Sequence, residues 1–222
     1  MGRYRPIAEM RSKEKKRVTE ILIRLDDAYP DVTCALRHEN PYQLLVSTVL
    51  SAQCTDVRVN LVTPDLFKQY PTPKELAQAD QTHLQKIIRS TGFFRNKSKN
   101  LIAGAKHLVE RCNGEVPDTM EALLQLPGVA RKTANVVLGT AFGISSGVVV
   151  DTHVKRLSQR LGFTFQRDPI KIEKDLMVYI PEDRWIDFSH QLIHHGRQIC
   201  KSRSPRCERC TLVDLCPYYQ GM

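Results

Sequence analysis

The sequence lacks any long apolar run. One of its longest, residues 147–150, has four residues, whereas a helix needs about 20 to cross a bilayer. The N-terminal segment is polar and basic, without the apolar core of a secretory signal peptide. We therefore expect a cytoplasmic protein that does not enter a membrane.

The sequence also lacks the alternating pattern of β-strands. Its one strand-like stretch, residues 148–150, is too short to find a partner strand, so we expect a buried linker there. Elsewhere, apolar residues recur every three or four positions, as in amphipathic helices. Helix starts are indicated by Asn40-Pro41, Asp168-Pro169 and two capping-box patterns, 72–75 and 118–121. The sequence thus predicts an all-α fold.

Acidic residues are in the minority. Lysine and arginine number 33 against 24 acidic residues, which gives a formal net charge of +9. Such a balance favours a polyanionic partner, although a membrane surface or simple solubility would also account for it. Basic residues gather near the C-terminus and in a second stretch made by Arg95, Lys97 and Lys99, while 11–17 is expected to be a solvated arm.

The cysteines number seven, and an odd number in a chain of this kind argues against a disulfide framework. Three of them stand among apolar neighbours and are expected to be buried: Cys34, Cys54 and Cys112. The remaining four are separated by six, two and five residues: Cys200, Cys207, Cys210 and Cys216. Thiols clustered in this way hold zinc or an iron–sulfur centre, and both remain open on chemistry alone.

A tight turn between two helical patterns occupies residues 126–134. Gly128 permits a backbone geometry that other residues resist, and the free N–H groups that begin the next helix suit a phosphate. Lys132 lies near that helix start, where the dipole and burial against a partner favour the neutral, nucleophilic amine. The alternative, usual for a lysine in a basic protein, is a surface lysine that contacts phosphate. Asp151 ends an apolar run and is expected to cap the following helix.

This hairpin, together with the downstream loop 142–153 that ends near Asp151, resembles the helix–hairpin–helix DNA glycosylase superfamily. The cysteine spacing is similar to that of the iron–sulfur loop in its endonuclease III branch. The resemblance implies an all-α, two-lobed fold with a C-terminal [4Fe–4S] loop held by the four cysteines named above. One lobe, residues 35–144, would be a six-helix barrel containing the hairpin; residues 1–34 plus 145–222 would form the iron–sulfur lobe.

The same resemblance implies a bifunctional DNA glycosylase and abasic-site lyase of base excision repair. Lys132 would attack C1′ of an oxidised pyrimidine nucleotide, Asp151 would assist, and β-elimination through a Schiff base would nick the strand. The partner would be double-stranded DNA carrying oxidised pyrimidines or abasic sites. We expect a monomer that works on the bacterial nucleoid in the cytoplasm.

Further residues are assigned to DNA by the resemblance. Gln53 would fill the space of an extruded base, and Phe93 would wedge between bases, although a core position for Phe93 and a helix-end role for Gln53 are alternatives. The remaining expected DNA contacts are Gly128, Ala130, Lys201, Arg203 and Arg206. Ala130 departs from the family pattern, which has a second glycine there; a left-handed backbone at Ala130 would cost about 1 kcal/mol.

The histidines have two expected roles, one near the site and one in packing. His153 would either line the lesion pocket or belong to the turn that begins the next helix. The helical pattern carrying His190, His194 and His195 is expected to serve packing, because four cysteines already complete a metal site.

Two other functions compete with this one. A non-enzymatic DNA-binding module would use the same hairpin, but it would have no use for Lys132 and Asp151. An iron–sulfur electron carrier would need neither the hairpin nor the net positive charge.

Overall fold

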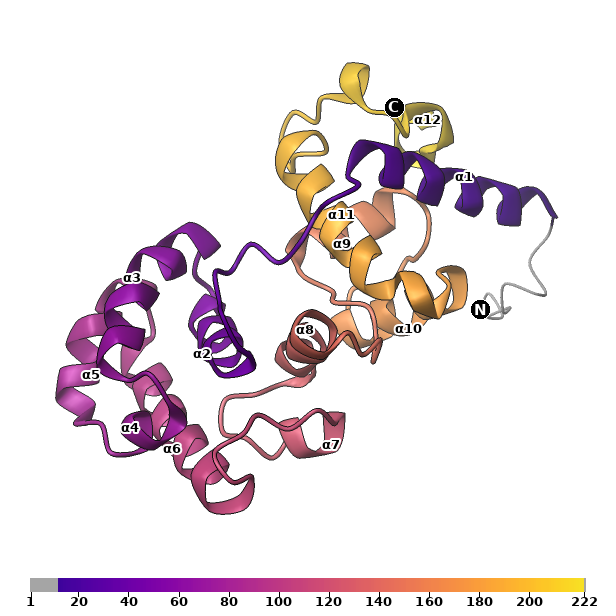
Figure 1. The fold of residues 1–222 in the computed structure, drawn as a ribbon. Coiled ribbons are helices and arrows are strands. Elements are labelled where there is room, and N and C mark those ends of the chain that lie inside the picture. Colours follow the sequence, from indigo (N-terminus) through magenta and orange to yellow (C-terminus); the bar gives the residue numbers. More distant parts are fainter. Residues whose placement is uncertain (1–11, 222) are drawn as a thin grey trace. The chain divides into compact units, whose positions relative to one another are not determined.

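A computed structural model describes residues 12–221 of the chain, and these contain helices but no strand (Figure 1). The all-α expectation is therefore confirmed. The helices divide between two compact units, one of residues 34–146 and the other of residues 12–33 together with 147–221. None of the described helices has the length and apolarity needed to span a bilayer.

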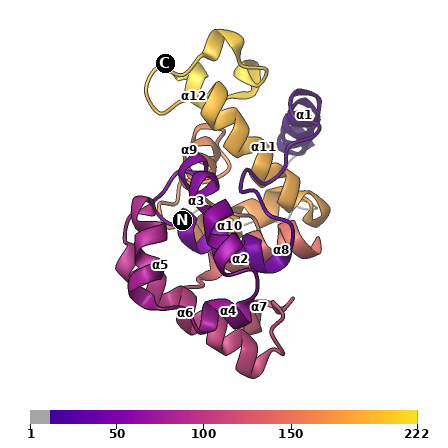
Figure 2. The same cartoon turned by 60° about the vertical axis from the view of Figure 1, so that its left-hand side comes forward.

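The 34–146 unit holds α2 to α8 (Figures 1 and 2). Its α2 packs against α8, and its α6 packs against α4 and α5. Fully buried leucines such as Leu50 and Leu84 lie in its core. The elements are α2 (Pro41–Ser51), α3 (Asp56–Gln69), α4 (Pro73–Ala77), α5 (Gln81–Ile88), the 3₁₀ turn η2 (Arg89–Thr91), α6 (Phe94–Arg111), α7 (Met120–Leu123) and α8 (Arg131–Phe142).

The other unit surrounds a core centred on the fully buried Phe188. Its α11 packs against α9 and α1. Residues 148–150 form no strand, and Val148 and Val150 are buried, as expected of a linker. The elements are α1 (Ser12–Ala28), α9 (Thr152–Arg160), α10 (Pro169–Tyr179), η3 (Glu182–Arg184), α11 (Trp185–Gln198), η4 (Cys207–Arg209), η5 (Val213–Leu215) and α12 (Pro217–Gln220).

Side-chain caps start these helices largely where the sequence indicates. Asn40 accepts a hydrogen bond from the Gln43 amide at 2.9 Å, and Thr72 with Glu75 forms a complete capping box. The expected box at 118–121 is wrong by one residue, because Thr119 rather than Asp118 caps α7. Both are good capping residues, so the local pattern could not choose between them.

Two other expectations fail. Within the described part of the 11–17 segment, Arg17 is not solvated: its guanidinium donates to the carbonyls of Leu161 at 2.8 Å and Leu215 at 3.2 Å. Arg11 lies outside the described residues. The three isolated cysteines are only half-buried, because each lies at the edge of a hydrophobic cluster rather than inside it.

Candidate functional site

The hairpin between α7 and α8 depends on a glycine. Gly128 has φ of +81°, in the left-handed region. A Cβ added there would lie 2.8 Å from Nδ2 and 2.9 Å from Cβ of Asn100 in α6. Backbone geometry and close packing therefore both require glycine at this position.

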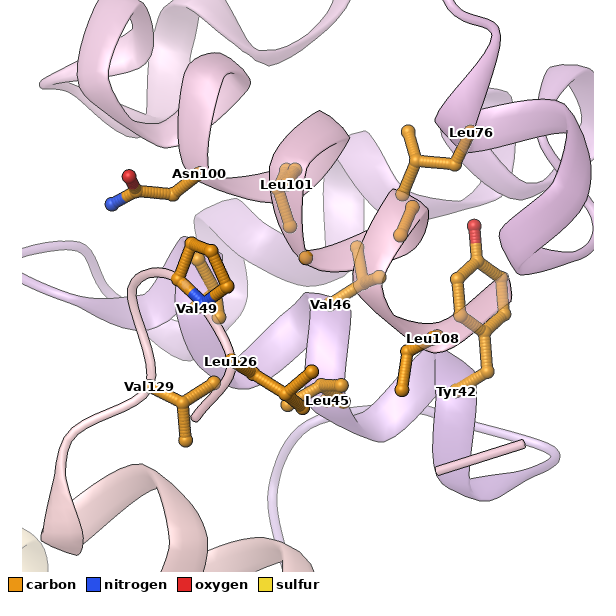
Figure 3. A pocket seen from close by; sticks show the side chains of 13 residues that line it. Tyr42, Leu45, Val46, Val49, Leu76, Asn100, Leu101, Leu108, Leu126 and Val129 are labelled. Atoms are coloured by element: carbon orange, nitrogen blue, oxygen red, sulfur yellow. The ribbon is translucent and has the colours of Figure 1, made fainter. Parts of the chain in front are cut away.

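Apolar side chains of the hairpin hold it against the helices behind. Leu126 and Val129 line a small cavity together with Leu45 and Val49 of α2, and Asn100 of α6 lies at its border (Figure 3). The turn is thus anchored on two helices of its own unit. This anchoring fixes the start of α8, which the hairpin leads into.

The helix α8 begins after Ala130, a residue without a polar side chain. Ala130 has φ of −99° and ψ of 168°, an extended conformation that any residue adopts, so the strain considered for Ala130 does not arise. Ala130, the N-cap residue, makes no side-chain cap to this helix, so its start carries the partial positive charge of the helix dipole without a capping carboxylate or hydroxyl from that residue. Lys132 follows in the first turn, and its side chain is exposed.

Asp151 caps α9, as expected from the sequence. Its Oδ1 accepts a hydrogen bond from the Val154 amide at 2.8 Å, and its side chain is half-buried. This bond fixes the carboxylate's orientation at the start of the helix. Asp151 belongs to the 147–221 stretch, whereas Lys132 belongs to the 34–146 unit.

His153, two residues further on, packs against α11. A Cβ added at Gly196 would lie 2.8 Å from His153 Nδ1, and Arg156 Nη2 lies 3.2 Å from the same nitrogen. Burial lowers the pKa of His153. These contacts support the turn-packing alternative for this side chain.

Gln53 and Phe93 both occupy loops in which the backbone is strained. Their φ angles are +54° and +48°, in the left-handed region that disfavours side chains. Both side chains are exposed, Phe93 to 61%. Exposure of a phenylalanine at a strained position excludes the core alternative for it.

Lys97, one of the three residues of the second basic stretch, is buried, with 5% exposure. Its ammonium Nζ donates to the carbonyl oxygens of Leu50 at 2.7 Å and Thr91 at 2.8 Å. Burial lowers the pKa of this lysine. Sequence reasoning missed this residue, since its two acceptors come from separate segments.

The four C-terminal cysteines line one cavity, which they share with Ile199, Val213 and Tyr218 among others. Burial raises the pKa of the Cys210 thiol to about 11, and the other three thiolates push it the same way. Arg160 donates to Cys200 Sγ at 3.2 Å, and His195 Nε2 lies 3.4 Å from Cys210 Sγ. Among the residues described, no three histidine, cysteine or acidic side chains are placed to hold a single metal ion.

The loop between the first two of these cysteines exposes three cations: Lys201, Arg203 and Arg206. Its two ends meet at one acceptor, because the amides of Lys201 and Arg206 both donate to the Ile199 carbonyl, at 2.9 and 3.0 Å. From α9, Arg160 also donates to the carbonyls of Lys201 and Ser202. The loop backbone is thereby held while its charged side chains face solvent.

His195 bears out the expectation that the α11 histidines serve packing. It is 2% exposed, and the hydroxyl of Tyr29, the residue that follows α1, lies 3.0 Å from its Nδ1. Burial lowers the pKa of His195 to about 4, so the ring is neutral near pH 7.

Comparisons with known proteins agree with this arrangement. A family model described as "HhH-GPD superfamily base excision DNA repair protein" matches residues 46–182, more than half of the chain. The chain is 57% identical to the endonuclease III of Synechocystis sp., over 97% of this chain and 98% of that protein. It is 40% identical to the Escherichia coli endonuclease III, over 92% and 96% of the two chains.

Solved structures give the same result. A non-covalent complex of an endonuclease III with DNA superposes with a TM-score of 0.88 at 43% identity, covering 93% of this chain and 97% of that one. A trapped covalent endonuclease III–DNA intermediate matches equally well. A thermostable thymine-DNA glycosylase, at 24% identity and a TM-score of 0.82, shares the fold. The chain therefore belongs to the HhH-GPD superfamily of base excision DNA repair proteins, in its endonuclease III branch.

Proposed function

We propose that Lys132 and Asp151 are the catalytic pair with which this chain, a bifunctional DNA glycosylase and abasic-site lyase, removes oxidised pyrimidines from duplex DNA. The observation that carries the proposal is the exposed lysine in the first turn of α8, behind a hairpin that only glycine permits. A covalent DNA intermediate has been trapped for a matched relative. Chemistry through an amine accounts for both base release and strand cleavage.

The reaction begins with the neutral Lys132 amine. It attacks C1′ of the damaged nucleotide, and the glycosidic bond breaks with its electron pair going to the base. The C1′–O4′ bond then opens, O4′ takes the proton that left the amine, and a protonated Schiff base forms at C1′. Loss of a proton from C2′ then expels the 3′ phosphate and nicks the strand. Asp151, ionised and fixed by its bond to the Val154 amide, would stabilise positive charge on the sugar and accept a proton from the amine.

The DNA backbone would be held near the hairpin. The positive end of the α8 dipole favours a phosphate oxygen at the start of this helix. Gly128 and Ala130 would approach the phosphate through their main chain, and Ala130 can do so without strain. The exposed cations Lys201, Arg203 and Arg206 would supply further phosphate contacts.

The damaged base must leave the helix before C1′ can be reached, at a cost of a few kcal/mol. Gln53 and Phe93 would offset this cost: one hydrogen-bonds the unpaired partner base and the other stacks between neighbouring bases. Their exposure and strained backbones support these roles. His153 would contribute to the pocket only through its packing at the start of α9.

A [4Fe–4S] cluster would be held by Cys200, Cys207, Cys210 and Cys216. The donor set fits, because all four line one cavity and two of their sulfurs have nitrogen partners within 3.4 Å. The raised pKa of Cys210 means that this thiol needs a cationic centre to hold it as a thiolate near pH 7. The cluster's role would be structural, because it would fix the loop that carries the three cations. Zinc is the less favoured occupant, because the spacing of the four cysteines is that of the iron–sulfur loop in the endonuclease III branch.

Borohydride trapping tests the nucleophile. Wild-type protein mixed with abasic duplex DNA and borohydride should give a stable adduct, since reduction locks the Schiff base. Lys132→Ala should give none while still binding DNA. Lys155→Ala, which removes a cation from the first turn of α9, is the control and should trap normally. Normal nicking by Lys132→Ala would end the proposal.

Asp151→Asn tests the carboxylate separately from its cap. Asparagine caps a helix as well as aspartate does, so the free energy of unfolding should change little. Base release under single-turnover conditions should slow by about 10²–10⁴-fold, as for loss of an acid–base group. Duplexes carrying single defined lesions would at the same time establish which oxidised pyrimidines are excised.

A further inference from the structure

Two loops of the 34–146 unit converge on one buried cation. Leu50, whose carbonyl accepts from Lys97 at 2.7 Å, lies three residues before Gln53. Thr91, whose carbonyl accepts at 2.8 Å, lies two residues before Phe93. The loops are separated by about forty residues of chain, and the Lys97 ammonium joins them through these two hydrogen bonds.

The acceptors are suited to a cation. Leu50 is in the last turn of α2, and Thr91 ends η2. Carbonyls at helix C-termini lack intrahelical partners and lie at the negative end of the dipole. Because Leu50 and Thr91 are at most 1% exposed, water cannot readily replace the lysine as donor.

The residues that follow these acceptors are strained. Only four non-glycine residues in the described chain have positive φ, and two of them are Gln53 and Phe93. A left-handed backbone persists at such residues only when the surrounding structure imposes it. The hydrogen bonds from Lys97 fix the chain immediately before each of them.

We propose that Lys97 is a positioning residue for base extrusion: its ammonium ties the ends of α2 and η2 together and so presents Gln53 and Phe93 as one preformed wedge. This rests on the proposed DNA contacts of Gln53 and Phe93. Lys97 itself is buried beneath the two loops and does not touch the DNA. Its removal would let each loop relax independently. The side chains of Gln53 and Phe93 would then no longer be held at a fixed separation.

Lys97→Met tests the proposal, because it keeps the aliphatic stem and removes both hydrogen bonds. Two reactions are compared: release of an oxidised pyrimidine from a fully paired duplex, and borohydride trapping on an abasic single strand, which needs no base extrusion. We expect the first to slow by about 10–100-fold, as misplacement of positioning groups does, and the second to change by less than about threefold. Fluorescence of 2-aminopurine placed opposite the lesion should report slower extrusion.

The controls separate positioning from charge and from stability. Lys106→Met removes an exposed cation from the same helix, and Leu76→Ala removes buried volume from the same unit. Neither should change the ratio of the two rates. Lys97→Arg retains a cation and several donors, so it should recover most of the duplex rate, and it serves as the second variant in case Lys97→Met does not fold.

Each result decides the question. An equal loss on both substrates, or no loss on either, would overturn the positioning role, as would a Lys97→Arg variant whose rate ratio falls below that of Leu76→Ala. Failure of the wild-type protein to release a base or form an adduct would instead refute the proposed function itself.

Discussion

In two regions of the molecule, cationic side chains hold loops by donating hydrogen bonds to backbone carbonyls. These regions are the two loops around Lys97 and the cysteine loop of 200–216, and they differ in how the cations are placed. In the first, a buried ammonium with 5% exposure donates to two carbonyls. In the second, Arg156 and Arg160 of α9, both half-buried, donate to carbonyls of the loop from its edge. The first arrangement is complete with protein atoms alone, whereas the second surrounds the cavity that the four cysteines line.

The difference implies that the two regions should respond separately to loss of the proposed cluster. The two loops around Lys97, called the wedge loops below, should keep their geometry without the cluster, while the cysteine loop should not. Removing the cluster, or changing either support, therefore tests whether the regions are independent.

The largest effect is expected from cluster loss. Cys207→Ser should leave Lys201, Arg203 and Arg206 on a disordered loop, so affinity for duplex DNA at physiological salt should fall by about 10³-fold, toward non-specific binding. Amide exchange should rise across 200–216 but stay unchanged across 91–97. Equal acceleration in both segments would show that the wedge loops also depend on the cluster.

Gly128→Ala should lower the free energy of unfolding of the 34–146 unit, which contains the hairpin, by about 2–3 kcal/mol. Alanine is strained at φ of +81°, and its Cβ would clash with Asn100. Urea unfolding measures this. The cost should shrink in an Asn100→Ala background, which removes the nearest atom.

Gly104→Ala is the matched control on α6. A Cβ there would meet only the Pro127 carbonyl oxygen, at 3.7 Å, so the substitution should stabilise the helix by about 0.5–1 kcal/mol. A similar gain from Gly128→Ala would contradict the close packing inferred for the hairpin.

Arg160→Met should loosen the cysteine loop by about 1–2 kcal/mol, since three hydrogen bonds to Cys200, Lys201 and Ser202 are lost. The observable is a severalfold faster loss of the cluster's visible absorbance in air. Lys155→Met, on the same helix, loses a bond to the Arg167 carbonyl instead and should retain the cluster. Identical decay of the absorbance in both variants would show that Arg160 does not stabilise the cysteine loop.

The smallest effect is expected at Ala130. Because its φ of −99° suits alanine, Ala130→Gly should destabilise the chain by about 0.5 kcal/mol, through the greater freedom of the unfolded state. Affinity for DNA should not improve. A clear gain in stability or in affinity would mean that the hairpin needs its second glycine after all.

The parts that the sequence predicted well depend on neighbours in the chain. The hairpin glycine, the Asn40 cap and the Asp151 cap each follow from a few consecutive residues. The all-α class follows from apolar spacing in the same way. Local signals also explain the error at Asp118, where two adjacent capping residues compete.

The parts that it missed depend on contacts across the chain. Lys97 has one acceptor 47 residues away, and Arg17 has acceptors more than 140 residues away. A count of charges treats both as solvated, because no short pattern reports burial of a cation by distant carbonyls. The pairing of Lys132 with Asp151, which belong to separate units, stays a prediction.

The most direct test of the central claim is to find the lysine that carries the sugar. After borohydride reduction of the wild-type protein on abasic duplex DNA, nuclease and protease digestion followed by mass spectrometry locates the remnant. The account predicts that it is attached to Lys132. A remnant on Lys97, Lys99 or the N-terminal amine, with Lys132 unmodified, would contradict it.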